Sequence, residues 1–164
     1  ANLGEYSVCG GELAAQGRWD NGLSARLTYA YTNEQLAKDK DGNTINNQYI
    51  PARKHAVNVR LDYDHDFTKN YGISAGISGR VLSGSENVEY KNYYDVSEGT
   101  VSVKYPAYTI WKLSLVQRIG KAIMLTTALD NLLNYRPKHY YLNCPLTDGT
   151  TLQVGLRVDI DKLF

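Results

Sequence analysis

The sequence lacks the long apolar runs and the charge imbalance that identify several large classes of protein. No apolar run reaches the roughly 18 residues of a membrane-spanning helix, so no transmembrane helix is predicted. Lys and Arg total 18 and Asp and Glu total 17, and this near balance gives no support for nucleic-acid binding. A hydrophobic fraction of 43% excludes a disordered tail.

Cysteine, phenylalanine and tryptophan are scarce. The two cysteines, Cys9 and Cys144, are compatible with a disulfide but more typical of two inert thiols. Tyrosine is abundant instead, with 14 residues against 2 Phe and 2 Trp, and it suits half-wet positions such as membrane-interface girdles and binding loops. Residues 1–11 lack the basic and apolar regions of a secretory signal, so either the protein stays inside the cell or the chain is a fragment with its front missing.

Apolar and polar residues alternate along most of the chain, most cleanly near its end. From Leu152 to Ile160 the even positions are Leu, Val or Ile, and the odd positions are polar or glycine. Such alternation predicts a β-strand with one apolar and one polar face, and no segment has a convincing helical period. The sequence therefore predicts an all-β fold, an antiparallel up-and-down meander of about seven strands, at residues 4–19, 23–32, 50–64, 71–83, 107–119, 122–133 and 150–164.

The connections between these strands are alternately short and long. Residues 20–22, 65–70 and 120–121 are predicted turns, whereas 33–48, 84–106 and 134–149 are predicted long loops. An antiparallel meander would then place every short turn at one end and every long loop at the other, as in outer-membrane β-barrels. A soluble sandwich, with the apolar face in its core, is the alternative. In the membrane interpretation, one continuous face should expose Leu27, Val59, Ile77, Leu113, Leu125 and Val154.

Seven strands do not make a bacterial barrel by themselves, because such barrels have an even number of strands, from about eight upward. An open sheet with an apolar face and two bare edges would also aggregate. We therefore expect the chain to be part of a larger barrel whose missing strands precede residue 1, which would also account for the absent signal.

Several motifs resemble those of TonB-dependent outer-membrane transporters. The run Tyr108-Thr-Ile-Trp-Lys-Leu-Ser-Leu, followed by Ile119-Gly-Lys and then by Leu129-Asp-Asn-Leu-Leu-Asn134, resembles closing strands of that family. Ile50-Pro-Ala-Arg-Lys-His55 resembles its I-P-x-x-P-K-H strand opening without the second proline, and Gly10-Gly-Glu-Leu resembles its G-x-E strand. The resemblance implies that this chain is the closing part of a 22-stranded transmembrane β-barrel, without the plug domain and the earlier strands.

The resemblance also implies a function and a location. The function would be TonB-dependent import of a chelated nutrient, such as an iron-siderophore or haem, across the outer membrane of a Gram-negative bacterium. TonB would act through the missing N-terminal part, and further partners would be outer-membrane lipid, lipopolysaccharide, the barrel-assembly machinery and, in some receptors, a surface lipoprotein. Cobalamin import by the same family and a passive porin are the alternatives. No cofactor and no nucleic-acid partner are implied.

Candidate site residues fall into three groups. Tyrosine offers rigid area with a polar tip, so the predicted ligand contacts are the loop residues Tyr93, Tyr94, His139, Tyr140 and Tyr141, with His139 a candidate haem ligand. Packing of these tyrosines on one another or among lipopolysaccharide is the alternative. The residues predicted to face the lumen and the plug are Arg26, Arg60, Arg80, Lys112, Asp130 and Arg157. Phe164 is predicted to be the signal for barrel assembly.

Catalytic and metal-binding motifs are scarce. The sequence has no G-x-S-x-G elbow, and His55, His65 and His139 are not paired with Cys, Asp or Glu at ligand spacing. An outer-membrane phospholipase or protease would need a Ser–His pair on its lipid-facing wall, and no serine at a matching height is evident near His55. Neither an enzyme nor a metal site is therefore predicted.

Overall fold

The structure, a computed structural model, describes residues 7–35, 53–92, 94–137 and 149–162. The chain divides into two compact units. The first comprises Ala1–Leu13, Tyr29–Ala56 and Leu82–Tyr108, and the second comprises Ala14–Thr28, Val57–Val81 and Thr109–Phe164. Within the described ranges, no helix has the length and apolar character needed to cross a membrane.

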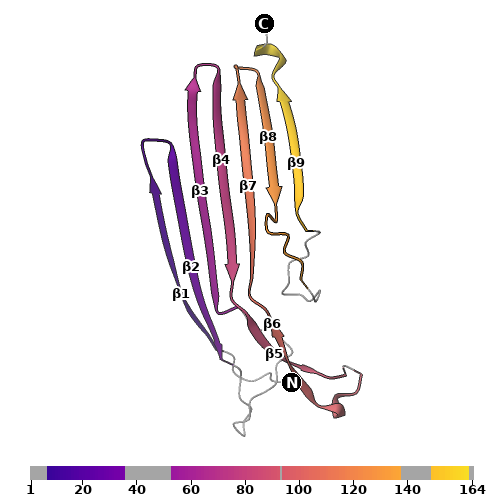
Figure 1. Cartoon of the computed structure of the whole chain (residues 1–164). Helices are drawn as coiled ribbons and strands as arrows, with labels where there is room; N and C mark the ends of the chain where they lie inside the picture. The colour runs from indigo at the N-terminus through magenta and orange to yellow at the C-terminus, as the bar shows by residue number, and fades with distance from the viewer. Residues whose placement is uncertain (1–6, 36–52, 93, 138–148, 163–164) are drawn as a thin grey trace. The chain divides into compact units, whose positions relative to one another are not determined.

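Seven strands form one sheet in which each strand pairs with its neighbours along the chain, apart from an inserted hairpin. The order is β1-β2-β3-β4-β7-β8-β9, and neighbouring strands are antiparallel (Figure 1). The predicted all-β meander of seven strands is thus confirmed. The strands are β1 (Ser7–Arg18), β2 (Leu23–Gln35), β3 (His55–Thr68), β4 (Tyr71–Leu82), β7 (Tyr108–Ile119), β8 (Ile123–Asp130) and β9 (Thr151–Val158).

The prediction of a plain loop at residues 84–106 is wrong. This segment forms a separate two-stranded sheet from β5 (Ser85–Tyr90) and β6 (Thr100–Tyr105), with a 3₁₀ turn, η1 (Val96–Glu98), in its tip. Ser85 pairs with Tyr105 at the base of the hairpin, and Tyr90 pairs with Thr100 near its tip. The run of alternating β-branched residues in β6 favours the extended conformation, and Gly99, with φ of 81°, provides the reversal.

Both ends of the predicted strand at 50–64 are displaced, and aromatic residues extend the later one. β3 begins at His55 rather than at 50 and continues to Thr68, through the predicted turn at 65–70. Its side chains form a continuous aromatic row: the Tyr63 and His65 rings are 5.9 Å apart, His65 and Phe67 are 4.7 Å apart, and Phe67 and Tyr71 of β4 are 6.0 Å apart. Packing in this row favours strand over turn at these positions.

The predicted strands at 122–133 and 150–164 both end early. β8 ends at Asp130 because Asn131 adopts a positive φ of 50°, and its side-chain amide accepts the Tyr135 N–H at 2.9 Å and donates to the Tyr135 carbonyl at 2.8 Å. β9 ends at Val158 because its partner there, Ile123, is the first residue of β8. Residues Ile160–Lys162 instead form the 3₁₀ turn η2, and Phe164 lies outside the described residues.

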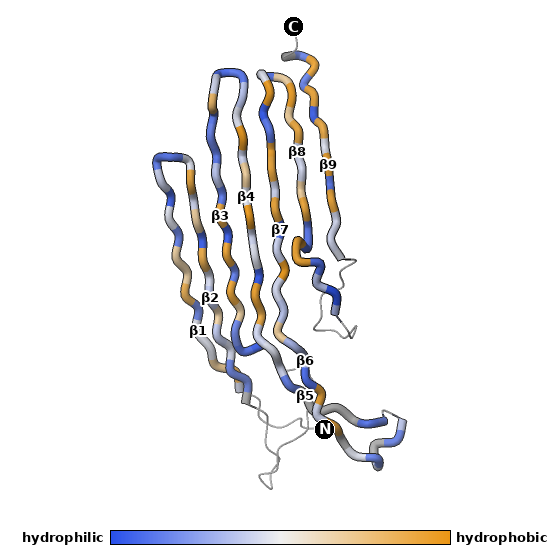
Figure 2. The backbone as a smooth tube through the Cα atoms, viewed as in Figure 1, coloured by the Kyte–Doolittle hydropathy of each residue, from blue (hydrophilic) through white to orange (hydrophobic). Residues whose placement is uncertain are grey.

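The register aligns one apolar and one polar row across the last three strands. Leu113 of β7 pairs with Leu129 of β8, which pairs with Leu152 of β9, while Arg118 and Arg157 both pair with Met124. Figure 2 shows the alternation along the strands. Because directly paired residues point to the same side of a sheet, the apolar side chains form one continuous surface.

That apolar surface is largely uncovered. The buried hydrophobic residues of the described chain are only Leu82, Tyr105 and Ala128. Of the six residues predicted to be exposed, Leu27, Leu113 and Val154 are 45%, 43% and 66% exposed. Val59, Ile77 and Leu125 are half-buried by the side chains beside them. The sheet therefore lacks the packed core of a soluble sandwich in the part described.

Candidate functional site

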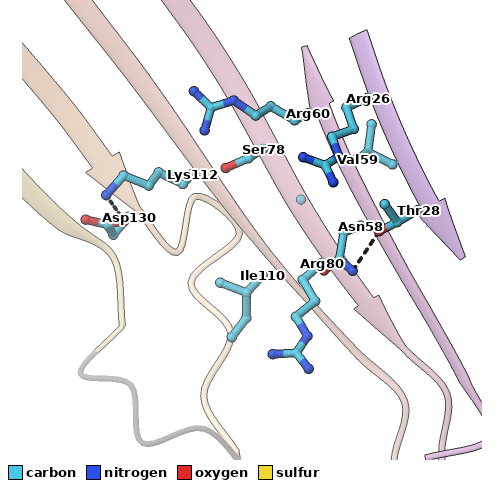
Figure 3. A pocket seen from close by; sticks show the side chains of 11 residues that line it. Arg26, Thr28, Asn58, Val59, Arg60, Ser78, Arg80, Ile110, Lys112 and Asp130 are labelled. Carbon is cyan, nitrogen blue, oxygen red and sulfur yellow. Dashed lines mark hydrogen bonds and ion pairs between the residues drawn. The ribbon is translucent and has the colours of Figure 1, made fainter. Parts of the chain in front are cut away.

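A hollow of about 510 Å³ lies on the polar face of the second unit. Most of its lining side chains occupy even positions on five strands, and Figure 3 shows them projecting from those strands. The lining residues are Arg26 and Thr28 of β2, Asn58, Val59 and Arg60 of β3, Ser78, Gly79 and Arg80 of β4, Ile110 and Lys112 of β7, and Asp130 of β8.

The polar face of β4 carries mostly small residues, and one of them, Ser78, lines the hollow. On its polar face, β4 carries Gly72, Ser74, Gly76 and Ser78 before Arg80, so the middle of the surface is low. A Cβ at Gly76 would lie 2.7 Å from the Asp62 carboxylate and 3.1 Å from the Ser114 hydroxyl. Side chains of the neighbouring strands therefore lie over the glycines of β4, and Ser78 lies on the floor of the hollow.

The hollow has an excess of positive charge. Arg60 forms a bidentate pair with Asp62, at 2.6 and 2.9 Å, and Lys112 lies 2.9 Å from Asp130. Arg26 and Arg80 have no acidic partner among the residues that the structure describes. Two of the four cations are therefore neutralised by a neighbouring carboxylate, and two are available to an anion.

Five of the six residues predicted to face a lumen gather around this hollow. Arg26, Arg60, Arg80, Lys112 and Asp130 all line it. Arg157 does not; it lines a second hollow, of about 240 Å³, beside the β7–β8 turn, together with Arg118 and Asp159. Parity places all six on the polar face, but their heights along the strands follow from the register.

A charged cluster that the sequence did not predict bridges two strands across a third. Arg118 of β7 lies 3.0 Å from Asp64 and 2.8 Å from Asp66, both on β3, and donates to the Ser74 hydroxyl of β4 at 2.5 Å. β4 separates these strands in the sheet, so the side chains meet only because Gly72 leaves room. The spacing of small residues in β4 was the available signal, but its use requires knowing that β7 follows β4.

A second unpredicted residue, Arg53, fixes the base of the hairpin in the first unit. Its guanidinium donates to the carbonyls of Ser83 and Pro106, at 2.5 and 2.8 Å, and stacks over the Tyr108 ring at 4.6 Å. These two carbonyls flank the β5–β6 hairpin on either side. A recess of about 630 Å³ at this base is lined by residues that include Lys54, Glu86 and Lys104.

Tyr94 is the only predicted ligand contact within the described residues, and it is fully exposed in the hairpin tip. Its backbone N–H donates to the Asn92 side chain at 2.9 Å. The pKa of Asp95 lies below its ordinary value, because the Ser97 hydroxyl and then the Ser97 backbone N–H donate to its carboxylate. The other predicted contacts, Tyr93, His139, Tyr140 and Tyr141, lie outside the described residues.

Of the histidines and cysteines, His55, His65 and Cys9 lie within the described residues. His55 accepts or donates a hydrogen bond with the Tyr29 hydroxyl at 2.8 Å and packs against Tyr31. Cys9 is a free, exposed thiol, and Cys144 lies outside the described residues. No cluster of three or more His, Cys, Asp or Glu suited to a metal ion occurs in the described ranges.

Comparison with known families gives one match for the chain that forms this sheet. A family model described as TonB dependent receptor-like, beta-barrel matches residues 1–132, which is well over half of the chain and includes every residue of the cationic hollow. Comparison with curated proteins gives no match. This family comprises TonB-dependent transporters and receptors rather than enzymes, and its members reside in the outer membrane of Gram-negative bacteria. The chain therefore belongs to the TonB-dependent receptor β-barrel family.

Proposed function

We propose that this chain forms wall and extracellular loops of a receptor that imports a chelated nutrient, an iron-siderophore or haem. The observation that carries the proposal is the two-faced sheet. One face exposes Leu113, Val154 and their apolar neighbours, as a lipid-facing wall requires, and the other carries charges around a hollow, as a wet lumen requires. Further strands would pair with the sheet edges at β1 and β9, because a closed barrel leaves no edge unpaired.

The polar-face residues would line the lumen. In this proposal Arg26, Arg80 and the paired cations Arg60 and Lys112, with Asp130, face the plug or the route past it. Arg157 would do so at a different height, beside the β7–β8 turn. Hydrogen bonds and ion pairs from a wet wall to a plug are of modest individual strength, so these residues would act as a set.

The loop tyrosines would contact the ligand. The full exposure of Tyr94 in the hairpin tip supports this role, because a rigid ring with a polar tip suits a bulky chelate. Tyr93, His139, Tyr140 and Tyr141 complete the proposed set. Arg53 would hold the hairpin in place at its base, through both flanking carbonyls.

The remaining partners are also proposals. Phe164, at the end of the chain, would be read by the barrel-assembly machinery, and a surface lipoprotein would be a further partner of some receptors of this type. These roles follow from the family resemblance rather than from the described geometry.

Uptake measurements on the complete receptor test the proposed function. In cells that lack other receptors, we expect uptake of a radiolabelled iron-siderophore or of haem that is lost when TonB is deleted. Uptake that persists without TonB would instead indicate a passive porin, and uptake of cobalamin alone would favour the other alternative.

A matched loop replacement then tests the tyrosines. Replacing residues 90–94 by a Gly-Ser segment of equal length, with Arg53 intact, should lower uptake of the substrate. The control replaces the surface turn at Lys121 in the same way. If uptake of all three candidates is unchanged, these tyrosines do not form the binding site.

A further inference from the structure

Two arginines of the cationic hollow lack the counter-charge that their neighbours have. Arg60 and Lys112 are each held by a carboxylate, whereas Arg26 and Arg80 have none in the part of the chain that the structure describes. Arg26 lies on β2 and Arg80 on β4, with β3 between them. The backbone pairing places Arg26 opposite Arg60 and Arg80 opposite Asn58, so the two arginines are offset by two residues along the strands. With strands about 4.8 Å apart and a rise of about 3.4 Å per residue, their backbones are about 12 Å apart.

The hollow has the size and polarity of a small-molecule site. Its volume of about 510 Å³ falls within the range of about 300–1,000 Å³ that is typical of ligand pockets. The Asn58 side chain donates to the Thr28 hydroxyl at 3.1 Å, which fixes the wall between β2 and β3. The Ser78 hydroxyl lies on the floor, and Val59 and Ile110 add apolar contact area.

We propose that this hollow binds a small organic molecule that carries two or more ionised carboxylates, held by Arg26 and Arg80. The planar guanidinium fork matches a carboxylate with two parallel hydrogen bonds, so two arginines on either side of one strand suit a ligand with two such groups. A doubly charged ligand would also neutralise the excess charge of the hollow. This inference rests on the proposed function, because it assigns the chemical class of the imported chelate or of its chelator.

Binding of tricarballylate to the purified complete receptor tests the proposal. Tricarballylate is a small tricarboxylate without the hydroxyl that would make it a strong metal chelator, so it reports on charge recognition alone. By titration calorimetry at low salt, we expect saturable binding that weakens as salt is raised, because the contacts are ionic.

The matched variants remove one positive charge at a time. Arg26→Gln and Arg80→Gln should each weaken binding by about tenfold or more, as loss of a charge-assisted hydrogen bond predicts, and the double variant should abolish it. Arg18→Gln is the control, because Arg18 is an exposed arginine of β1 outside the hollow. It should change the affinity by less than about twofold, since only screened long-range attraction is lost.

Three outcomes would overturn the proposal. These are no binding to the unmodified receptor, equal binding to the receptor with both substitutions, or equal weakening by Arg18→Gln. If the double variant also lowers the unfolding midpoint while tricarballylate does not bind, the two arginines hold an acidic protein segment instead. If tricarballylate does not bind but cells that carry the unmodified receptor still show TonB-dependent uptake, the proposed function stands while the anion site does not.

Discussion

Substitution of Gly72 by alanine tests whether the Arg118 cluster stabilises the wall. A Cβ at this position would meet the Asp66 carboxylate and would lie 2.8 and 3.1 Å from two nitrogens of the Arg118 guanidinium. These atoms are the ends of flexible side chains, so they would move aside rather than strain the backbone. The cost of Gly72→Ala should therefore equal the interactions that Arg118 loses.

The contacts of Arg118 determine how much Gly72→Ala should lower the free energy of unfolding. Its side chain is 29% exposed, and its partners Asp64 and Asp66 are 61% and 71% exposed, so each ion pair contributes about 0.2–1 kcal/mol. The hydrogen bond to Ser74 adds about 0.5–1.5 kcal/mol. Alanine in place of glycine offsets part of this loss, because it restricts the unfolded chain and so stabilises the fold by about 0.4–1 kcal/mol. We expect a net loss of about 1 kcal/mol in the free energy of unfolding.

A double-mutant cycle isolates the effect. Four forms of the complete receptor in phospholipid vesicles would be unfolded with guanidinium: the unmodified receptor, Gly72→Ala, Arg118→Ala and the double variant. Once Arg118 is absent, Gly72→Ala should be neutral or stabilising by about 0.5 kcal/mol. Gly11→Ala is the matched control, because no atom lies within 4 Å of a Cβ at that strand position. An equal destabilisation by Gly72→Ala with and without Arg118 would refute the reasoning.

Three further changes probe the hairpin, the apolar face and assembly. Arg53→Ala removes the guanidinium nitrogen that donates to both the Ser83 and the Pro106 carbonyl, so protease cleavage within the hairpin of intact cells should quicken, whereas Lys54→Ala should leave it unchanged. Leu156→Arg on the apolar face should destabilise the receptor in vesicles by about 2–4 kcal/mol, whereas Gln153→Arg on the polar face should be nearly neutral. Phe164→Asp should lower the amount of receptor in outer-membrane fractions, and unchanged amounts would contradict its role in assembly.

Local alternation explains why the strands were predictable. A period of two is a property of neighbouring residues, so the faces of Leu152–Val158 follow from the sequence without knowledge of any partner strand. Strand ends were less predictable because they depend on the partner. β9 ends where β8 begins, and β3 extends because Phe67 meets Tyr71 on the next strand.

The sequence predicts on which face of the sheet the site residues lie, but not their positions along the strands. Parity assigns Arg26, Arg80 and Arg157 to the polar side, but only the register shows that the first two share a hollow and the third does not. The Arg118 cluster joins residues about 50 positions apart in sequence, across an intervening strand. The β5–β6 hairpin escaped prediction because its short strands mix Glu, Asn and Lys with β-branched residues.

The charge of the hollow also bears on which of the proposed substrates the receptor would carry. The hairpin at residues 84–106 contains four acidic residues, Glu86, Glu89, Asp95 and Glu98, and two lysines, so it does not attract anions. Arg26 and Arg80 suit carboxylates. Haem has an apolar ring with two carboxylates, and many iron chelators carry carboxylates, whereas cobalamin bears amides in their place. Arg26→Gln with Arg80→Gln should therefore impair uptake of haem or a carboxylate chelate and leave any cobalamin uptake unchanged.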